Sequence, residues 1–229
     1  MKISVALAAY NGEKYIEKQL ESILRQLRSG DEVIVSDDCP RSAMSVLVKD
    51  IAKSDARVKY IEGLSQGVIK NFENAIKNST GDVIFLCDQD DVWLDDKVQS
   101  VMKEIENGAD LVLHDAIVAD ANLNHTCESF FDKHESKLGL LNNIAKNSYM
   151  GCCMAFKSEL KADILPFPNG LPMHDQWIGL IAEKKYKVKL LNKPLILYRI
   201  HGENVTGGKT KLTNKIKWRI NICKNLLRK

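Results

Sequence analysis

An uninterrupted apolar run ends in three carboxylates at Val83-Ile84-Phe85-Leu86-Cys87-Asp88-Gln89-Asp90-Asp91. The five apolar residues have the length of a strand that is buried on both faces. Three carboxylates within four residues repel one another, and a bound dication would remove that repulsion. Oxygen ligands suit Mg²⁺ or Mn²⁺, so the cluster predicts a metal site at the end of a core strand. A second interpretation stays open, in which Asp90 or Asp91 caps a helix that begins near Trp93.

Strand-like and helix-like segments alternate before this point. Three earlier runs have strand length and composition, at Ile3–Leu7, Glu32–Ser36 and Val58–Ile61. Helical spacing of apolar residues separates the four strands, at Ile16–Leu27, Ala43–Lys53 and Val68–Asn78. Asn11 is a suitable N-cap for the first helix. The alternation predicts an α/β fold with a mostly parallel central sheet flanked by helices.

Polar residues follow three of these strands directly. Tyr10-Asn11 follows the first strand, Asp37-Asp38 the second, and Asp88 to Asp91 the fourth. Ligands of open α/β sheets bind outside the carboxyl ends of the strands. We therefore expect the three polar clusters to meet at one edge of the sheet and to form one site.

The second half of the chain is less regular. The pattern predicts strands at 110–118, 187–191 and 195–199, a helix at 174–183 and a loop at 166–172. Residues 120–147 are polar and carry no clear period. The apolar stretch at 149–156 surrounds Gly151, which either lets a substrate approach closely or marks a strand bulge.

Composition is that of a soluble globular protein of 229 residues, 45% hydrophobic and 28% charged. No apolar run approaches the roughly 18–20 residues that span a bilayer. The start Met1–Ala8 is interpreted as a core strand rather than a secretory signal. Six cysteines without a CxxC pair predict reduced thiols and a cytoplasmic protein, with Cys87 and Cys152 in the core.

Charge is distributed unevenly although the formal net charge is +3. Eight of the 33 basic residues and none of the 30 acidic ones fall in 209–229. Helical spacing there gathers one apolar face, made of Leu212, Ile216, Ile220, Cys223 and Leu227. Such a basic amphipathic helix can contact the cytoplasmic face of an anionic membrane, dock on the rest of the chain or bind a partner, and all three remain open. The acidic body argues against nucleic-acid binding.

Three motifs together resemble the family 2 glycosyltransferases with the GT-A nucleotide-diphospho-sugar transferase fold. They are Ala8-Ala9-Tyr10-Asn11, Val35-Ser36-Asp37-Asp38 and Phe85-Leu86-Cys87-Asp88-Gln89-Asp90-Asp91-Val92-Trp93. The last resembles the bacterial rhamnosyltransferase-like branch of cell-surface polysaccharide assembly. The resemblance is close over residues 3 to about 97 and extends more weakly to about 206.

The resemblance implies roles for residues around the nucleotide. Ala8, Tyr10 and Asn11 would line the base pocket. Asp38 would accept a hydrogen bond from a pyrimidine N3–H, which favours a UDP- or dTDP-sugar. Asn71 would approach the nucleotide, whereas Lys70 is better explained as part of a solvated helix face.

The resemblance also implies the metal ligands. Asp88 and Asp90 match the two acids of the DxD motif, Asp90 as a direct ligand of Mn²⁺ or Mg²⁺ and Asp88 nearer the ribose and sugar. In Tyr198-Arg199-Ile200-His201, the histidine would be a further metal or diphosphate ligand and Arg199 would pair with phosphate. A structural role for His201 is equally open.

A third group concerns the acceptor. Met173-His174-Asp175-Gln176-Trp177 stands where the family has its acidic catalytic pair, with histidine in place of the first acid. Asp175 would be the general base that deprotonates the acceptor hydroxyl; the alternative is a charge that complements a helix dipole. Gly151 and Trp177 would contact the acceptor, and Trp177 is equally consistent with a core anchor.

These observations predict an inverting glycosyltransferase that moves a sugar from a UDP- or dTDP-sugar to a glycan or lipid-linked acceptor. The expected domain is 1–208, with a nucleotide-binding half (1–97) and an acceptor-binding half (98–208), followed by the basic helix 209–229. Two alternatives are a nucleotidyltransferase and a non-catalytic nucleotide-sugar binding module. The first usually has a glycine-rich basic loop after its first strand, which Ala8–Glu13 lacks. The second needs no base near an acceptor.

Overall fold

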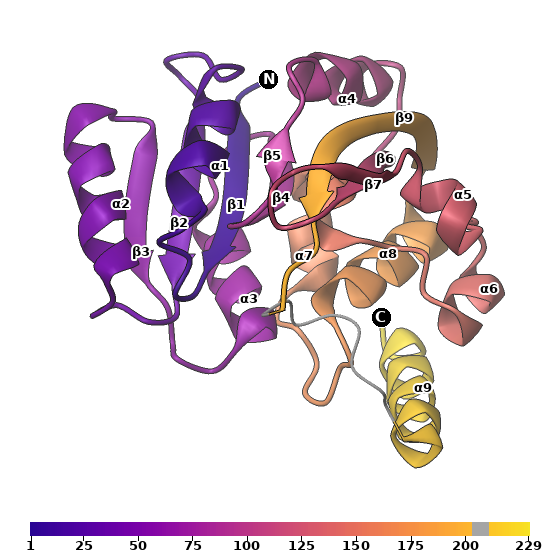
Figure 1. Cartoon of the computed structure of the whole chain (residues 1–229). Helices are drawn as coiled ribbons and strands as arrows, with labels where there is room; N and C mark the ends of the chain where they lie inside the picture. The colour runs from indigo at the N-terminus through magenta and orange to yellow at the C-terminus, as the bar shows by residue number, and fades with distance from the viewer. Residues whose placement is uncertain (203–210) are drawn as a thin grey trace.

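Residues 1–202 and 211–229 are described by the computed structural model, and the strands in this part of the chain form one mixed sheet (Figure 1). Its strand order is β3-β2-β1-β4-β8-β6-β9-β5, with β7 beside β6. The strands are β1 (Ile3–Ala9), β2 (Glu32–Asp37), β3 (Val58–Glu62), β4 (Val83–Asp88), β5 (Val92–Trp93), β6 (Leu111–Ala119), β7 (His125–Cys127), β8 (Met154–Lys157) and β9 (Val188–Arg199).

Nine α-helices lie within these described ranges. They are α1 (Ile16–Leu24), α2 (Ala43–Ser54), α3 (Val68–Asn78), α4 (Lys97–Glu106), α5 (Phe130–His134), α6 (Leu140–Ala145), α7 (Lys161–Ile164), α8 (His174–Lys185) and α9 (Leu212–Leu226). Two 3₁₀ turns, η1 (Gly151–Cys153) and η2 (Ser158–Leu160), precede and follow β8.

The N-terminal half of the sheet is parallel, as the strand-helix alternation predicts. β1 lies between β2 and β4, and Ala8 is in register with both Ser36 and Asp88. The carboxyl ends of β1, β2 and β4 are therefore neighbours, which confirms that their polar clusters share one edge. β8 runs antiparallel to β4 and joins this half to the parallel pair β6 and β9. One sheet thus spans both predicted halves of the chain.

The first helix begins later than predicted. Asn11 adopts a left-handed φ of 50°, and α1 starts at Ile16 with Tyr15 as its N-cap. The Gly12 carbonyl accepts hydrogen bonds from both Tyr15 and Ile16 N–H groups, so a turn separates β1 from the helix. The N-cap prediction for Asn11 is wrong because that residue belongs to this turn.

The two short strands predicted at 187–191 and 195–199 form one strand, β9. Its pairing with β6 shifts at Asp115, which lies opposite Pro194 whereas His114 lies opposite Leu191. The shift accommodates a proline that donates no ladder hydrogen bond, and the strand continues past it. The unassigned segment 120–147 contributes β7, α5 and α6.

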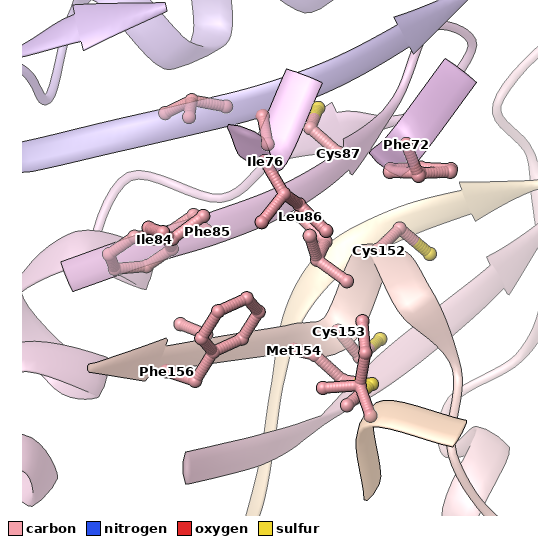
Figure 2. Close-up of a cluster of buried hydrophobic side chains, with 14 of the residues drawn as sticks. Phe72, Ile76, Ile84, Phe85, Leu86, Cys87, Cys152, Cys153, Met154 and Phe156 are labelled. Carbon is pink, nitrogen blue, oxygen red and sulfur yellow. The ribbon is translucent and has the colours of Figure 1, made fainter. Parts of the chain in front are cut away.

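The core lies where β4 meets β8 and α3 (Figure 2). Phe72 and Ile76 of α3, Phe85 of β4 and Phe156 of β8 are all fully buried there. Cys87 and Cys152 are free, buried thiols, as the sequence predicts. This packing fixes the end of β4, which carries the acidic cluster.

Helix α9 docks on α6 and α8, at the end of the molecule farthest from β3 (Figure 1). It does so through Ile222 and Leu226, which are 1% and 5% exposed. Two residues of the apolar face predicted from the sequence, Ile216 and Ile220, are instead about half exposed. Docking is thus the observed arrangement, through a different face. The predicted boundary at 208/209 falls outside the described residues.

Side-chain contacts with carbonyl oxygens fix the position of α9. The Arg219 guanidinium donates to the Ile144 and Ala145 carbonyls, and the Lys184 ammonium donates to the Leu226 carbonyl. Among the described residues, no helix has both the length and the apolar character needed to cross a bilayer.

Ile222→Ala is expected to lower the free energy of unfolding by about 2–4 kcal/mol, because it leaves a cavity under α9. Ile220→Ala, two residues away on the exposed face, is the matched control and should change it by less than about 0.5 kcal/mol. Urea unfolding followed by circular dichroism measures both. Equal losses in the two variants would contradict the docking geometry.

Candidate active site

Unsatisfied polar atoms occur on the elements that meet at the carboxyl edge of the sheet. Asn71 Oδ1, Asp91 Oδ2 and both ring nitrogens of His174 are buried without a hydrogen-bond partner. Buried polar groups in folded proteins are nearly always paired. Other such atoms occur elsewhere, on Gln19, Trp93, His114, Ser136 and Glu183. At the edge of the sheet, a polar ligand or water could pair with Asn71 Oδ1 and Asp91 Oδ2.

Tyr10 is held at this edge by its backbone. Its N–H donates to Gln89 Oε1 (2.7 Å) and its carbonyl accepts from Gln89 Nε2 (2.9 Å). The Tyr10 ring is 60% exposed and is free to contact a base. Ala8 is nearly buried between β2 and β4, whereas Asn11 is exposed. Gln89, which sequence reasoning passed over, therefore links the acidic loop to the predicted base pocket.

The two acids that end β2 have different tasks. Asp37 is fully buried and accepts hydrogen bonds from Ser45 Oγ (2.7 Å) and Tyr60 Oη (3.0 Å). Asp38 accepts backbone N–H groups from Ser65 (2.9 Å) and Gly67 (2.7 Å). Each Asp38 oxygen keeps a second lone pair, so the predicted contact with a pyrimidine is compatible with this geometry. Asp37 is structural.

The start of α3 lies beside the first motif. Asn71 is buried, and its Nδ2 donates to the Ala9 carbonyl (3.0 Å) while its Oδ1 has no partner. Lys70 pairs with Glu73 (2.6 Å), as expected for a helix face. Asn71 is thus the residue of this pair that has unused hydrogen-bonding capacity.

Asp90 and His201 are in direct contact although they are 111 residues apart. Asp90 Oδ2 lies 2.8 Å from His201 Nε2, and both side chains are mostly buried. The His201 ring stacks on Tyr15, with centroids 4.9 Å apart. A dication bound here would take the place of the hydrogen bond between the two side chains.

Arg199 supports the acidic loop rather than standing free to meet phosphate. Its Nε donates to the Asp90 carbonyl and its Nη1 to the Ala121 carbonyl, both at 2.7 Å. Its backbone N–H donates to Asp91 Oδ1 (3.0 Å). The end of β9 is thereby tied to the loop after β4. The predicted pairing of Arg199 with phosphate stays a prediction.

Asp88 and Asp91 form a second acidic group next to Asp90. One ligand atom each from Asp88, Asp91 and Cys152 falls within 4.8 Å of the others. Burial, followed by repulsion from Asp90, raises the pKa of Asp88 to about 7 and that of Asp91 well above its ordinary value. Helix α4 begins at Lys97 with Asp96 as its N-cap, so the interpretation of Asp90 or Asp91 as a helix cap is wrong.

The carboxylates of Asp88 and Asp91 fit a hard dication, whereas the Cys152 thiol is a softer donor and Asp90 and His201 lie outside this group of three. Burial makes these carboxyl groups costly to ionise without a counter-charge, and Asp91 Oδ2 has no hydrogen-bond partner. A bound Mn²⁺ or Mg²⁺ would supply that charge. Of the three predicted ligands, Asp90 and His201 contact each other directly, and Asp88 groups with Asp91 and Cys152. Asp91, next to Asp88, belongs to the acidic cluster from which the metal site was predicted, but it was not among the ligands that the resemblance implied.

Lys97 is a second feature that sequence reasoning missed. Its side chain is fully buried, its ammonium donates to the Cys152 carbonyl (2.8 Å) and it lies 4.1 Å from the centroid of the Trp93 ring. A buried cation beside the acidic group offsets part of its negative charge. In the sequence, Lys97 is simply a lysine six residues after Asp91. Such a spacing is too common to have identified it as a site residue.

Asp175 lies at the first turn of α8 and is 9% exposed. Burial raises its pKa to about 7, and hydrogen bonds from the Gln176 N–H and Asn147 Nδ2 limit that rise. A carboxyl with a pKa near neutrality can accept a proton under physiological conditions. The geometry and the pKa both suit the predicted base.

Gly151 and Trp177 occupy different environments. Gly151 is in the η1 turn rather than in a strand bulge, and a Cβ on it would lie 2.9 Å from His174 Nε2. Trp177 is fully buried, and its Nε1 donates to the Ile164 carbonyl (2.9 Å). The indole has no surface left for an acceptor, which corrects its prediction as an acceptor-binding residue. It anchors α8 in the core.

Two cavities lie away from these groups. One of about 580 Å³ is lined by α1, α2 and Arg57, and one of about 220 Å³ lies between the N-terminus and α4. Neither includes a predicted site residue. The evidence for the candidate active site is therefore its buried polar groups and not a cavity.

Residues 4–163 match the family described as Glycosyl transferase family 2, and because the match covers more than half of the chain, this chain belongs to that family. The dTDP-rhamnosyl transferase RfbG of Shigella flexneri is 25% identical over 96% of this chain and 79% of its own length. The GalNAc(5)-diNAcBac-PP-undecaprenol beta-1,3-glucosyltransferase of Campylobacter jejuni is 25% identical over 92% and 69%. The chain spans 66% of an uncharacterized Nostoc sp. glycosyltransferase and 30% of Streptococcus pneumoniae GlyA.

Solved structures establish the GT-A fold. S. aureus TarS 1–349 in complex with UDP-GlcNAc aligns with a TM-score of 0.78 at 23% identity, over 99% of this chain and 67% of that one. The mannosyltransferase PcManGT from Pyrobaculum calidifontis in complex with GDP-Man and Mn²⁺ aligns with a TM-score of 0.65 at 20% identity, over 98% and 61%. The fold class predicted from the sequence is confirmed.

Asp90→Asn is expected to weaken Mn²⁺ binding roughly tenfold or more, because it removes a carboxylate ligand. Mn²⁺ titration followed by thermal unfolding measures the effect. Asp95→Asn, which changes an exposed acid five residues on, is the matched control and should bind as the wild type does. Unchanged Mn²⁺ affinity in Asp90→Asn would remove Asp90 from the ligand set.

Proposed function

We propose that the chain is an inverting glycosyltransferase that transfers a sugar from a UDP- or dTDP-sugar to a glycan or lipid-linked acceptor of a bacterial surface polysaccharide. The observation that carries this proposal is the arrangement of two acidic groups. Asp175 is close enough to Asp88 for its charge to raise the pKa of Asp88. A direct displacement requires a base near the leaving-group site, and Asp175 is the residue that we propose for that role.

Asp175 performs the proton transfer in this mechanism. Its carboxylate accepts the proton of the acceptor hydroxyl while that oxygen attacks the anomeric carbon. The bond from that carbon to the diphosphate oxygen breaks in the same step, which inverts the configuration. Asn147 and the Gln176 N–H hold the carboxylate in position.

In the proposed mechanism the diphosphate leaves at the acidic loop after β4. Asp90, with His201 and Asp88, would hold Mn²⁺ or Mg²⁺, which supplies charge stabilisation to the departing diphosphate when bound. Gln89 holds the backbone of Tyr10 beside this loop, so the proposed base pocket is linked to the proposed diphosphate site by two hydrogen bonds.

Donor and acceptor classes rest on the relatives and on Asp38. A carboxylate that accepts an N3–H favours uracil or thymine over cytosine. TarS was solved with UDP-GlcNAc, RfbG is named a dTDP-rhamnosyl transferase, and the Campylobacter relative is named for a polyprenyl-diphosphate-linked glycan. These names support a pyrimidine nucleotide donor and a glycan acceptor for this chain.

Asp175→Asn is expected to reduce turnover at least about 10²-fold with nucleotide binding retained. Wild-type kcat should rise with pH through about 7, as Asp175 loses its proton, and the variant should lack that limb. Donor hydrolysis in Mn²⁺ is the assay, and Asp132→Asn, an exposed acid on α5, is the control. Nucleotide-sugar binding with no turnover in the wild type would favour the binding-module alternative.

The same substitution has an expected effect on stability. A carboxyl whose pKa is raised by folding destabilises the folded protein as pH rises from its ordinary value of 3.8 toward about 7. Metal-free Asp175→Asn should therefore unfold at a higher temperature than the wild type at pH 8, with a smaller difference at pH 5. A lower Tm at pH 8 would contradict the burial of an ionisable base.

We propose that the outer face of α9 contacts anionic membranes in a peripheral manner. Docking through Ile222 leaves Ile216 and Ile220 outward. Six cations on α9 or just beyond its ends are also exposed, namely Lys211, Lys215, Lys217, Lys224, Arg228 and Lys229. Such a face suits a surface of acidic headgroups, where a lipid-linked acceptor would lie.

Flotation with phosphatidylglycerol–phosphatidylcholine vesicles tests this contact. The wild type should float with these vesicles at low salt and remain in solution with phosphatidylcholine alone. Replacing both Ile216 and Ile220 by Ser should reduce flotation with Tm unchanged. Absence of wild-type flotation would remove the membrane proposal and leave the transferase proposal intact.

A further inference from the structure

Tyr149, in the segment just before η1, packs along one face of helix α8. The residue is 4% exposed, and its hydroxyl donates to Glu183 Oε1 (2.6 Å). Its ring covers Gly179, where an added Cβ would lie 2.3 Å from two ring carbons. Asp175, Gly179 and Glu183 are spaced four residues apart, so they lie on the same side of the helix. Tyr149 is therefore held one and two turns after the proposed base.

The Asn147 amide connects Tyr149 to Asp175. Its Oδ1 accepts the Tyr149 N–H (3.0 Å), and its Nδ2 donates to the Tyr149 carbonyl (3.1 Å). The same Nδ2 donates to Asp175 Oδ1 (3.3 Å). An amide has an acceptor at one end and donors at the other, and the Tyr149 N–H can bond only the acceptor. The Tyr149 backbone thus turns the donor end of Asn147 toward the carboxylate.

The Tyr149 hydroxyl has a purpose other than filling space. A phenylalanine at this position would cover Gly179 equally well, so the apolar contact does not require the oxygen. Glu183 Oε1 also accepts the Gly139 N–H (2.9 Å) and Asn143 Nδ2 (3.1 Å), which fixes the position of that carboxylate. The hydroxyl therefore bonds to a fixed acceptor and sets where Tyr149 lies along α8.

We propose that Tyr149 is a positioning residue for the general base and acts on Asp175 through the Asn147 amide. This inference rests on the proposed function, in which Asp175 deprotonates the acceptor. A donor that is held in place favours the ionised carboxylate, which is the form that accepts a proton. The contacts run from Glu183 to Tyr149, from there to Asn147, and from the amide to the base.

Each element next to Asp175 contributes to its protonation. Burial raises its pKa to about 7, and N–H donors limit that rise, namely a backbone N–H of α8, the Asn147 amide and the Gly151 N–H of η1. His174, adjacent on α8, is neutral because burial lowers its pKa to about 3. Asp88, on β4, is an acidic neighbour. Loosening the Asn147 amide should therefore raise the pKa of Asp175 further.

Tyr149→Phe tests the proposal, since it keeps the ring and removes the hydroxyl. The assay is donor hydrolysis in Mn²⁺ as a function of pH, with UDP-GlcNAc or dTDP-rhamnose, whichever the wild type hydrolyses faster. We expect the rise of kcat to move to higher pH by about 0.5. The value of kcat at pH 7 should fall roughly two- to fivefold, with KM for the donor unchanged.

Tyr186→Phe is the matched control. The Tyr186 hydroxyl donates to Asp163 Oδ2 at the same distance of 2.6 Å, at the end of α8 away from the base. Its loss should lower Tm about as much as Tyr149→Phe does and leave the dependence of kcat on pH unchanged.

A double variant tests the route through the amide. Asn147→Ala should move the rise of kcat at least as far as Tyr149→Phe does. Tyr149→Phe combined with Asn147→Ala should lie close to Asn147→Ala alone, because two residues that act in series are not additive. Additive shifts would overturn the proposed route.

The results separate this inference from the function on which it rests. A wild type without turnover contradicts the proposed function, and a wild type whose kcat does not rise with pH contradicts Asp175 as the base; the positioning role fails with either. A wild type that shows the rise, together with a Tyr149→Phe variant whose rise has not moved, overturns the positioning role alone. A lower Tm in that variant would then show that the hydroxyl is purely structural.

Discussion

Repulsion among carboxylates at the end of β4 is the constraint around which this edge of the molecule is arranged. Asp88 and Asp91 are held where ionisation is costly. The chain supplies compensation from several directions, with the Arg199 backbone on Asp91, the His201 ring on Asp90 and the buried Lys97 beneath. None of these partners is a full counter-ion for a group of three acids. The remaining negative charge is what a bound dication would balance.

The fold and the location of the site follow from local patterns. The buried strands at Ile3–Leu7 and Val83–Cys87 can be predicted from the sequence, because each is a short run of strand length that is followed by polar residues. Parallel pairing then brings Tyr10, Asp38 and Asp88 together without further information. The second half of the sheet was harder to predict, because β9 continues past Pro194 only with a shift of register against β6. The sequence of one strand does not indicate where its register against another strand shifts.

Residue roles were less predictable than residue positions. Trp177 and Asp175 are two residues apart on one helix, and only the packing of α8 shows that one is a core anchor and the other the better candidate for chemistry. Lys97 and Gln89 are unremarkable in sequence, and their importance comes from partners that lie far along the chain. The outer face of α9 was visible as an apolar stripe, but which stripe docks depended on Arg219 and the carbonyls of α6.

The pairing of Asp90 with His201 has a consequence for biosynthesis. His201 follows β9, so it can contact the acidic loop after β4 only when β9 has been synthesised. By then Asp90 has been part of the nascent chain for more than a hundred codons. An emerging N-terminal half can form its parallel strands, yet its acidic loop lacks the imidazole and the Arg199 contacts. The proposed cation site would therefore be completed late in translation. Truncated products would carry the nucleotide motif without the complete means of holding a diphosphate.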